Sequence, residues 1–344
     1  MENKNIEIKE VELKNNLEKT EEEIFEEKVL NASEKIKEVI SEVHKKIVGQ
    51  DELIKSMIIW LLSKWHILIE WVPWLAKTLT VDTLSKTLNM WFNRVQFTPD
   101  LLPSDLVWTE IYNPKTWEFA IKKWPIFNNF ILADEINRAP SKVQSALLEA
   151  MAEKQITIWK ETFKLEEPFI VLATQNPIEQ SWTYRLPEAQ LDRFMMKVNV
   201  DYASKENEKE MYKKLNSWFE DIKINKILNK KEIKEIQSIL NDIYVSDNIY
   251  EYVADIIETT RNWNIKWVSE YISYWISPRW GLSLIAWAKV LALMDSRTFV
   301  TPEDIKQIAK SVLSHRLVLN YEAVVNDITS DDIVNKVLEN VKVI

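Results

Sequence analysis

The residue that most limits how this chain can turn is glycine, because the sequence holds only two Gly beside sixteen Trp in 344 residues. Several of the Trp stand where a tight turn or loop is expected. Trp117 lies at the tip of a turn sequence that begins at Asn113, Trp159 separates two short alternating runs, and Trp71 and Trp74 punctuate the segment after an apolar run. Such positions need a positive φ, which Gly adopts readily and which Trp adopts only at a steric cost. The chain reads as a glycine-bearing protein with Trp written in place of most of its Gly.

A translation artefact would produce this pattern. Some bacterial lineages read the UGA codon as Gly, and translating such a gene with a table in which UGA means Trp converts every UGA-encoded Gly into Trp. The two remaining glycines, Gly49 and Gly281, would then have ordinary codons. Reading all Trp as Gly brings glycine to about 5% of the chain, near its usual share of about 7%. The alternative is that the Trp are genuine core residues, and UGG codons at the sixteen positions would establish it.

Composition places the chain among globular proteins. Hydrophobic residues are 46% and charged residues 28%, and the length favours two domains. The net charge of −9 argues against nucleic acid as the main partner. With no Cys, the chain has neither disulfides nor thiolate metal sites, and its three His are scattered singly. The sequence contains no apolar run of membrane-spanning length and no apolar signal region at its start. We therefore expect a cytoplasmic protein.

The hydrophobic pattern predicts an α/β fold with two domains that follow a charged N-terminal extension. Residues 1–30 are rich in Glu, Lys and Asn and are expected to form a charged, partly helical extension. A helix is expected to begin at Asn31, where Glu34 would complete a capping box. Apolar strands then alternate with helices, which is typical of a three-layer core around a parallel sheet. The predicted elements are strands at 66–70, 130–133 and 169–173 and helices at 51–62, 76–90 and 141–154. Residues 31–203 would form this core, and residues 204–344 a smaller all-α domain.

A phosphate-binding loop is predicted between the strand at 66–70 and the following helix. Such a loop needs Gly-x-x-x-x-Gly-Lys-Ser/Thr, because backbone N–H groups must close around phosphate oxygens. With Trp read as Gly, residues 71–78 become Gly-Val-Pro-Gly-Leu-Ala-Lys-Thr, in which only Ala76 departs from the pattern. Lys77 would reach the β- and γ-phosphates of ATP, and the Thr78 hydroxyl would be a ligand of Mg²⁺. The predicted nucleotide-binding residues here are Trp71, Val72, Pro73, Trp74, Leu75, Ala76, Lys77 and Thr78.

Two carboxylates follow the strand at 130–133. Asp134 would hold Mg²⁺, and Glu135 would polarise the attacking water. An acidic helix start after a buried strand is the plain alternative, but the preceding phosphate loop favours the catalytic interpretation. Asn176, after the strand at 169–173, either contacts the γ-phosphate or lytic water or simply caps a loop.

The order and spacing of these motifs resemble the MoxR family of AAA+ ATPases, in the branch that also holds magnesium-chelatase ATPase subunits. The resemblance covers roughly residues 45–325, and its one systematic departure is Trp where the family has Gly. It begins at Val48-Gly49-Gln50 and returns late in the chain at Ser277–Arg279 and Ser314–Leu317. The segments that carry it best are Phe97–Asp105, Ala133–Ala139, Gln144–Met151, Ala173–Pro177 and Leu186–Phe194.

The resemblance implies roles that the residues alone leave open. It places Val48 and Gly49 at the nucleotide, Asn176 as sensor 1, and Arg193 as the arginine finger that acts on ATP held by a neighbouring subunit. Arg279 matches sensor 2, and we expect Ser277 to be the N-cap and Pro278 the first residue of its helix. Whether Arg279 acts within its own subunit or on a neighbour stays open.

The resemblance also implies an assembly and a task. Two hairpins, one within residues 97–126 and one at 155–165, would face the central pore of a homo-oligomeric ring, expected to be a hexamer. ATP hydrolysis would drive chaperone-like remodelling of a protein client or metal insertion, with a von Willebrand A-type protein as a possible partner. A nucleic-acid motor of a related branch is the alternative, and the acidic balance disfavours it. A nucleotide-dependent scaffold with little turnover is a third, which applies if the Trp are genuine.

Overall fold

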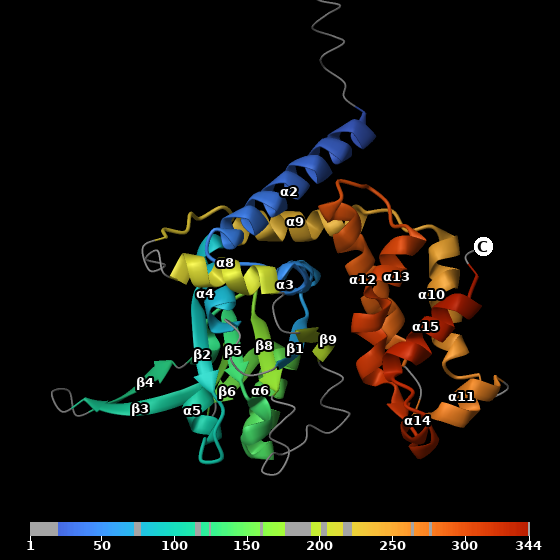
Figure 1. The fold of residues 1–344 in the computed structure, drawn as a ribbon. Coiled ribbons are helices and arrows are strands. Elements are labelled where there is room, and N and C mark those ends of the chain that lie inside the picture. The colour runs from blue at the N-terminus through green and yellow to red at the C-terminus, as the bar shows by residue number, and fades with distance from the viewer. Residues whose placement is uncertain are drawn as a thin grey trace, which may run out of the picture.

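The structure, a computed structural model of the chain, describes residues 20–71, 77–113, 118–123, 125–158, 161–175, 194–200, 205–215, 222–262, 265–274 and 277–342. Its centre is a five-stranded parallel sheet flanked by helices, beside which the later helices gather as a separate group (Figure 1). The strand order across the sheet is β2-β5-β8-β1-β9. The strands are β1 His66–Trp71, β2 Phe92–Gln96, β5 Phe130–Asp134, β8 Ile170–Gln175 and β9 Phe194–Val200.

The sheet is buried on both faces, which confirms the predicted three-layer α/β core. Alternate residues of each strand point to opposite faces. Ile67 of β1 and Leu132 of β5 join one hydrophobic cluster, whereas Leu68 and Ile131 join the other. The first cluster includes helices α3 (Asp51–Ser63) and α4 (Lys77–Thr87), and the second includes α5 (Pro103–Val107) and α6 (Ser141–Glu153).

The three strands predicted from apolar runs, β1, β5 and β8, are present, as are the three helices predicted at 51–62, 76–90 and 141–154. Two strands, β2 and β9, were not predicted. Their sequences mix polar and apolar residues because they form the two edges of the sheet, where only one long side has a strand partner.

Two antiparallel hairpins project from the core and confirm the two predicted hairpins. Strands β3 (Trp108–Asn113) and β4 (Glu118–Lys123) pair from Trp108 with Lys123 to Asn113 with Glu118, and they extend away from the sheet (Figure 1). Strands β6 (Gln155–Ile158) and β7 (Glu161–Lys164) form the second hairpin. The tips that contain Trp117 and Trp159 lie outside the described residues.

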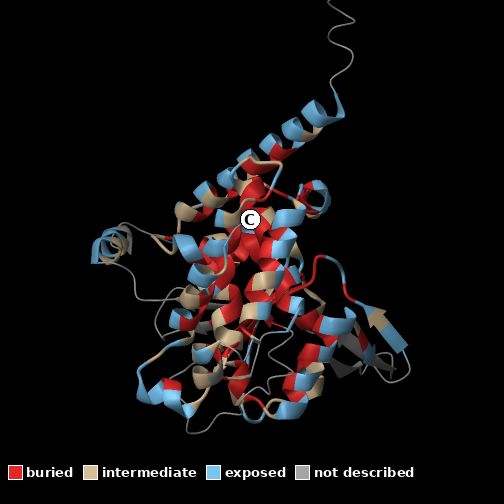
Figure 2. Cartoon of the chain, turned by 90° about the vertical axis from the view of Figure 1, so that its right-hand side faces the viewer, coloured by how far each residue is buried: buried red, intermediate tan, exposed pale blue. Residues whose placement is uncertain are grey.

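Helix α2 (Glu21–His44) corrects the prediction of a helix start at Asn31. The capping box lies at Thr20, whose hydroxyl accepts from the Glu23 N–H at 3.2 Å while the Glu23 carboxylate accepts from the Thr20 N–H at 2.9 Å. The prediction was wrong because the helix already runs through residue 31, with its buried stripe starting at Val29. Its outer turns are mostly exposed (Figure 2), whereas the later turns pack on α3 and on α12 (Arg279–Met294).

The described elements beyond residue 204 are mainly helices, as predicted, together with a two-stranded sheet of β10 and β11. Helix α8 (Lys205–Leu215) lies by the core. The largely buried α12 is contacted by the later helices α9 (Lys230–Asp242), α10 (Asp247–Thr259) and α13 (Pro302–Leu313). The division of the chain at residues 30 and 203 stays a prediction. The elements after α8 are α9 Lys230–Asp242, α10 Asp247–Thr259, α11 Lys266–Tyr271, β10 Ile272–Tyr274, α12 Arg279–Met294, α13 Pro302–Leu313, β11 Val318–Leu319, α14 Tyr321–Val325 and α15 Ser330–Asn340. Short 3₁₀ helices lie at Pro125–Phe127, Ile136–Arg138 and Ser314–Arg316.

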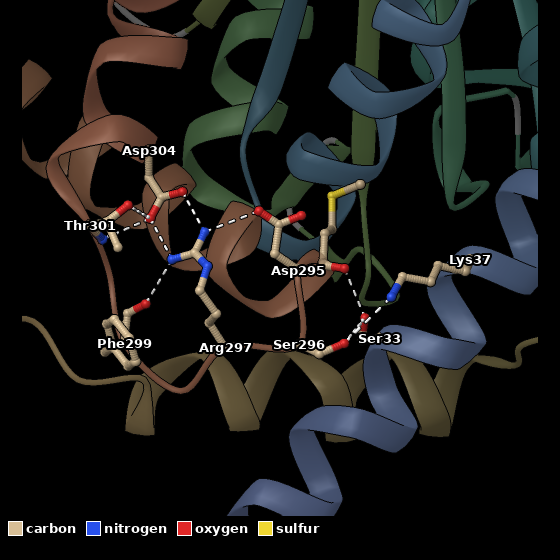
Figure 3. A network of polar contacts seen from close by, with 9 residues as sticks. Ser33, Lys37, Asp295, Ser296, Arg297, Phe299, Thr301 and Asp304 are labelled. Atoms are coloured by element: carbon tan, nitrogen blue, oxygen red, sulfur yellow. Dashed lines mark hydrogen bonds and ion pairs between the residues drawn. The ribbon is translucent and has the colours of Figure 1, made fainter.

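A polar cluster fixes the turn between α12 and α13 (Figure 3). Arg297 donates from Nη2 to Asp304 Oδ1 at 2.6 Å and from Nη1 to Asp304 Oδ2 at 2.9 Å. These hydrogen bonds, with a further one to Asp295, raise the pKa of Arg297 above its ordinary value. Nearby, Ser33 of α2 donates to the Met294 carbonyl at 2.8 Å, so the same turn also holds α2. Among the described helices, none combines the length and apolarity that a membrane crossing requires.

Candidate active site

A cluster of polar side chains lies where β2, β5 and β8 end. Asp134, the last residue of β5, is only 1% exposed although it carries a carboxylate. Thr174 of β8 donates its hydroxyl to Asp134 Oδ1 at 2.6 Å and accepts the Glu135 backbone N–H at 2.9 Å. Because parallel strands place their carboxyl ends at one edge of the sheet, three distant segments of the chain meet here.

Arg94 of β2 is the main counter-charge of Asp134. Its Nη2 lies 2.5 Å and its Nε 3.1 Å from Asp134 Oδ2. The same Nη2 donates to Gln96 Oε1 at 2.9 Å. Residues 94 and 96 alternate along β2 and therefore share the face of the sheet on which Asp134 and Thr174 lie. A buried carboxylate needs such a partner, since an unpaired buried charge is strongly unfavourable.

Glu135 is placed differently from Asp134. Its backbone takes the left-handed conformation, with φ of 57°, which turns the chain out of the strand and into the short 3₁₀ helix at Ile136–Arg138. Gln96 donates from Nε2 to Glu135 Oε2 at 2.8 Å, and Arg138 Nη1 lies 3.0 Å from the same oxygen. The Glu135 side chain is 22% exposed, so water can reach it while two donors hold its orientation.

The predicted phosphate loop joins β1 to α4. β1 ends at Trp71 and α4 begins at Lys77, so these two predicted residues lie at the ends of the loop. Val72, Pro73, Trp74, Leu75 and Ala76 lie outside the described residues. Thr78 is half-buried in the first turn of α4, and α4 packs against β2 and β5. The N-terminus of a helix favours anions because its N–H groups are unpaired and its dipole is positive there.

The turn before α3 lies beside the same helix. Thr80 of α4 donates to Gln50 Oε1 at 3.3 Å, which holds the turn that contains Val48 and Gly49. Gly49 has φ of +65°, and a Cβ there would lie 2.4 Å from Asn207 Nδ2 of α8. The left-handed backbone favours glycine at this position, and a larger residue would also require the Asn207 side chain to move.

Of the remaining predicted site residues, Arg279 is the one that lies within the described part of the chain. Arg279 is exposed as the first residue of α12, in the first helical turn as predicted. The N-cap prediction at Ser277 was wrong by one residue, because the helix begins after Pro278 and has no side-chain cap there. Asn176 and Arg193 lie outside the described residues, at the end of β8 and just before β9. Arg316 donates to the carbonyl of Phe194, the residue after Arg193, and so joins the helical domain to this part of the chain.

The described residues suit a Mg²⁺ ion that is shared with a nucleotide. Mg²⁺ prefers oxygen ligands and is usually held by one or two carboxylates together with substrate phosphates rather than by a full protein cage. The Asp134 carboxylate and the Thr78 hydroxyl are oxygen donors on elements that pack together, β5 and α4. The residues that sequence reasoning missed are Arg94, Gln96 and Thr174. The alternation of polar, apolar and polar residues at Arg94, Val95 and Gln96 was the only signal for the first two.

Comparisons with known proteins agree with this geometry. The family model of the ATPase family associated with various cellular activities (AAA) matches residues 66–196, and the AAA lid domain matches residues 265–337. The Mycobacterium tuberculosis protein "Chaperone MoxR1" is 42% identical over 309 residues, covering 89% of this chain and 81% of that protein. The uncharacterized protein YeaC of Bacillus subtilis is 38% identical over 304 residues, with coverages of 88% and 93%.

A solved structure shows the same fold over nearly the whole chain. The crystal structure of a protein assigned as an ATPase from Cytophaga hutchinsonii matches with a TM-score of 0.86 and 46% identity, over 93% of this chain and 98% of that one. Sheet order, loop position and helical lid thus define the class as an AAA+ ATPase fold. Within that class, the chain belongs to the MoxR family.

Proposed function

We propose that this protein hydrolyses ATP with Mg²⁺ at the carboxyl edge of its sheet and uses the energy to remodel a protein client. The observation that carries the proposal is the arrangement at the end of β5. A buried Asp134 and an accessible Glu135 lie on adjacent residues, beside a helix that begins with Lys77 and Thr78. This division of two neighbouring carboxylates between metal binding and water activation is suited to phosphoanhydride hydrolysis.

Each residue has a distinct task in the proposed reaction. Lys77 places its charge on the β- and γ-phosphates, and Thr78 and Asp134 hold the metal. Bound Mg²⁺ would neutralise charge on the phosphates and orient them. Glu135, held by Gln96 and Arg138, accepts the proton of the attacking water. Asn176 positions that water, and Arg193 of a neighbouring subunit and Arg279 stabilise charge that develops during transfer.

The client and the assembly rest on the family. One relative is named a chaperone, which supports a chaperone-like task for this chain. AAA+ proteins usually act as oligomers, and we propose a hexameric ring with the hairpins β3–β4 and β6–β7 at its pore. A von Willebrand A-type partner, metal insertion as the outcome and a cytoplasmic location belong to the same proposal.

We also propose that the natural protein carries Gly at the positions written as Trp. Eight of the sixteen Trp lie within the described residues. Trp60 and Trp287 are each 1% exposed, and their indole N–H groups have no hydrogen-bond partner in the structure, whereas Trp91 is 72% exposed. Buried indoles normally find a partner for their N–H. The unpartnered N–H groups of Trp60 and Trp287 and the exposed ring of Trp91 support Gly at these three positions in the natural protein.

Two substitutions test the hydrolytic function in protein made with Gly at the sixteen positions. Glu135→Gln should retain ATP binding and lower turnover at least about 100-fold, because the amide keeps the shape and loses the base. Lys77→Ala should weaken binding itself, since the charge on the phosphates is lost. Normal turnover by Glu135→Gln would show that the catalytic assignment is wrong.

Mixing experiments test the ring. Arg193→Ala should keep nucleotide affinity and lose most turnover, because a finger arginine contributes on the order of 10³-fold or more to the rate. Mixing it with Glu135→Gln should restore part of the activity, since some interfaces pair an intact Arg193 with an intact Glu135. No recovery despite demonstrated subunit exchange would exclude Arg193 as a residue that acts on its neighbour.

A further inference from the structure

We propose that Arg94 is a positioning residue that competes with a divalent cation for the Asp134 carboxylate and thereby raises the cation concentration at which the site fills. The proposal rests on the proposed ATPase function, in which Asp134 is the metal-binding carboxylate. It concerns a residue of β2 that lies outside the phosphate loop and outside the pair of carboxylates at the end of β5.

The geometry makes Arg94 a direct competitor of a cation. Both of its donors, Nε at 3.1 Å and Nη2 at 2.5 Å, converge on one oxygen, Asp134 Oδ2. The other oxygen, Oδ1, accepts the Thr174 hydroxyl at 2.6 Å. A cation that binds Asp134 therefore meets a guanidinium within hydrogen-bond distance of the same carboxylate. Like charges this close disfavour each other, and burial strengthens the effect because water screens it less.

Arg94 can leave Asp134, because its guanidinium has a second hydrogen-bond acceptor and its side chain is partly exposed to solvent. The Arg94 side chain is 46% exposed, in contrast to 2% for Asp134. Its Nη2 also donates to Gln96 Oε1 at 2.9 Å, so the guanidinium keeps a partner when it leaves Asp134. Asp134 is buried, and a buried carboxylate needs partners of opposite charge or hydrogen-bond donors to stay charged. A metal that binds Asp134 can take over the part of this compensation that Arg94 provides.

The same guanidinium connects the two carboxylates of the site. Gln96, which accepts from Arg94, donates from Nε2 to Glu135 Oε2 at 2.8 Å. A shift of Arg94 away from Asp134 therefore reaches the carboxylate that is proposed to activate water. Metal loading and the orientation of Glu135 are linked through two hydrogen bonds of Gln96.

The test measures metal affinity without nucleotide, with Mn²⁺ as the probe and its free electron paramagnetic resonance signal as the readout. Arg94→Met keeps the length and apolar stem of the side chain and removes its charge. We expect this variant to bind Mn²⁺ about tenfold more tightly than the unchanged chain. A positive charge this close to a carboxylate changes the equilibrium constant for binding another cation about tenfold or more. Arg94→Lys retains the charge and should bind Mn²⁺ within about twofold of the unchanged chain.

A matched control comes from the second Arg–Asp pair. Arg297→Met removes the partner of the buried Asp304 in the helical domain and should leave Mn²⁺ affinity unchanged. The Arg94 variant should also lose more thermal stability in metal-free buffer than in millimolar Mg²⁺, whereas Arg297→Met should lose the same amount in both. An unchanged or weaker Mn²⁺ affinity in Arg94→Met would overturn the proposal.

Nucleotide binding separates this proposal from the ATPase assignment. In protein made with Gly at the sixteen positions, Arg94→Met should need several-fold less Mg²⁺ to reach half-maximal binding of a fluorescent ATP analogue. Absence of ATP binding in the unchanged protein would refute the proposed function, while the Mn²⁺ result would still decide the role of Arg94. Loss of metal-independent ATP binding in Arg94→Met would identify Arg94 as a phosphate ligand and contradict its role as counter-ion of Asp134.

Discussion

Two aspartates are buried in the part of the chain that the structure describes, Asp134 in the core and Asp304 in the helical domain, and an arginine holds each in a different way. Arg297 grips both oxygens of Asp304, at 2.6 and 2.9 Å, and lies only seven residues away in the chain. Asp304 also accepts from the backbone and the hydroxyl of Thr301. These contacts form one local cap at the start of α13, so the pair fixes a turn.

Arg94 grips one oxygen of Asp134 from a different strand, forty residues away in the chain. Its side chain is 46% exposed, against 24% for Arg297. The surroundings of an Arg–Asp pair therefore decide whether the pair is structural or functional. An arginine that binds both carboxylate oxygens within one turn stabilises the fold. An arginine that binds one carboxylate oxygen at the carboxyl edge of a parallel sheet can be displaced by a ligand.

The largest expected effect comes from replacing each aspartate with asparagine. Asp134→Asn should lower Mg²⁺-dependent ATP turnover at least about 100-fold in protein with Gly at the sixteen positions, with little change in urea unfolding. Asp304→Asn should leave turnover per folded molecule near normal and lower the free energy of unfolding by about 2 kcal/mol, since Arg297 loses a partner. The reverse pattern would break the comparison.

A second prediction concerns a structural polar anchor within the core, at the amino end of β1. His66 is buried, accepts from the Val171 N–H at 3.1 Å, and has its other ring nitrogen 3.2 Å from the Met151 carbonyl. Burial lowers the pKa of His66 from 6.5 to about 4. The folded protein therefore disfavours protonation of this ring, whereas in the unfolded chain the ring binds a proton below pH 6.5.

The free energy of unfolding should accordingly be unaffected by His66 above pH 6.5 and fall by up to about 3 kcal/mol between pH 6.5 and 4. Urea unfolding across this range measures the change. His66→Gln should be less stable at neutral pH but should lack this part of the slope. An equal slope in the variant would assign the acid sensitivity to other groups.

A third prediction concerns the helix cap at the start of α13. Thr301→Ala removes the hydroxyl that lies 2.9 Å from Asp304 Oδ2 in the capping box of α13. The free energy of unfolding should fall by about 1 kcal/mol, the usual cost of losing a helix cap. Thr301→Ser keeps the hydroxyl and should recover most of the loss in the same unfolding assay.

The smallest expected effect is at the edge of the same cluster. Lys37 donates to the Ser296 hydroxyl at 3.4 Å from an exposed position on α2 (Figure 3). Lys37→Ala should change the free energy of unfolding by less than about 0.5 kcal/mol, because exposed polar contacts of this length contribute little. A loss as large as that of Thr301→Ala would mean that α2 is held to the helical domain mainly by this contact.

The sequence predicted the parts of the site that are local. Asp134 and Glu135 follow an apolar run directly, so their position at the end of a buried strand could be inferred from neighbouring residues. Arg94 and Gln96 could not, because β2 is a short edge strand of mixed polarity and its pairing with β5 spans about forty residues. Which strands become neighbours in a parallel sheet depends on packing over the whole domain.

At the start of α2 the local sequence was ambiguous, because two stretches match the same helix-start signal. Asn31 with Glu34 and Thr20 with Glu23 both match a capping box, and only the second is one. A polar cap sequence inside a helix is harmless when the apolar stripe continues through it, as it does from Val29 to Val43. The pattern was correct as a helix signal but did not fix the first residue.

The central claim is that the segment between β1 and α4 is a phosphate-binding loop in the natural protein, with Gly at positions 71 and 74. Titration of ATP in the presence of Mg²⁺ into two full-length forms, one as written and one with Gly at the Trp positions, tests it most directly. We predict saturable binding by the glycine form and no binding by the form with Trp71 and Trp74, because indoles keep the backbone amides from the phosphates. Equal affinity of the two forms would contradict the account.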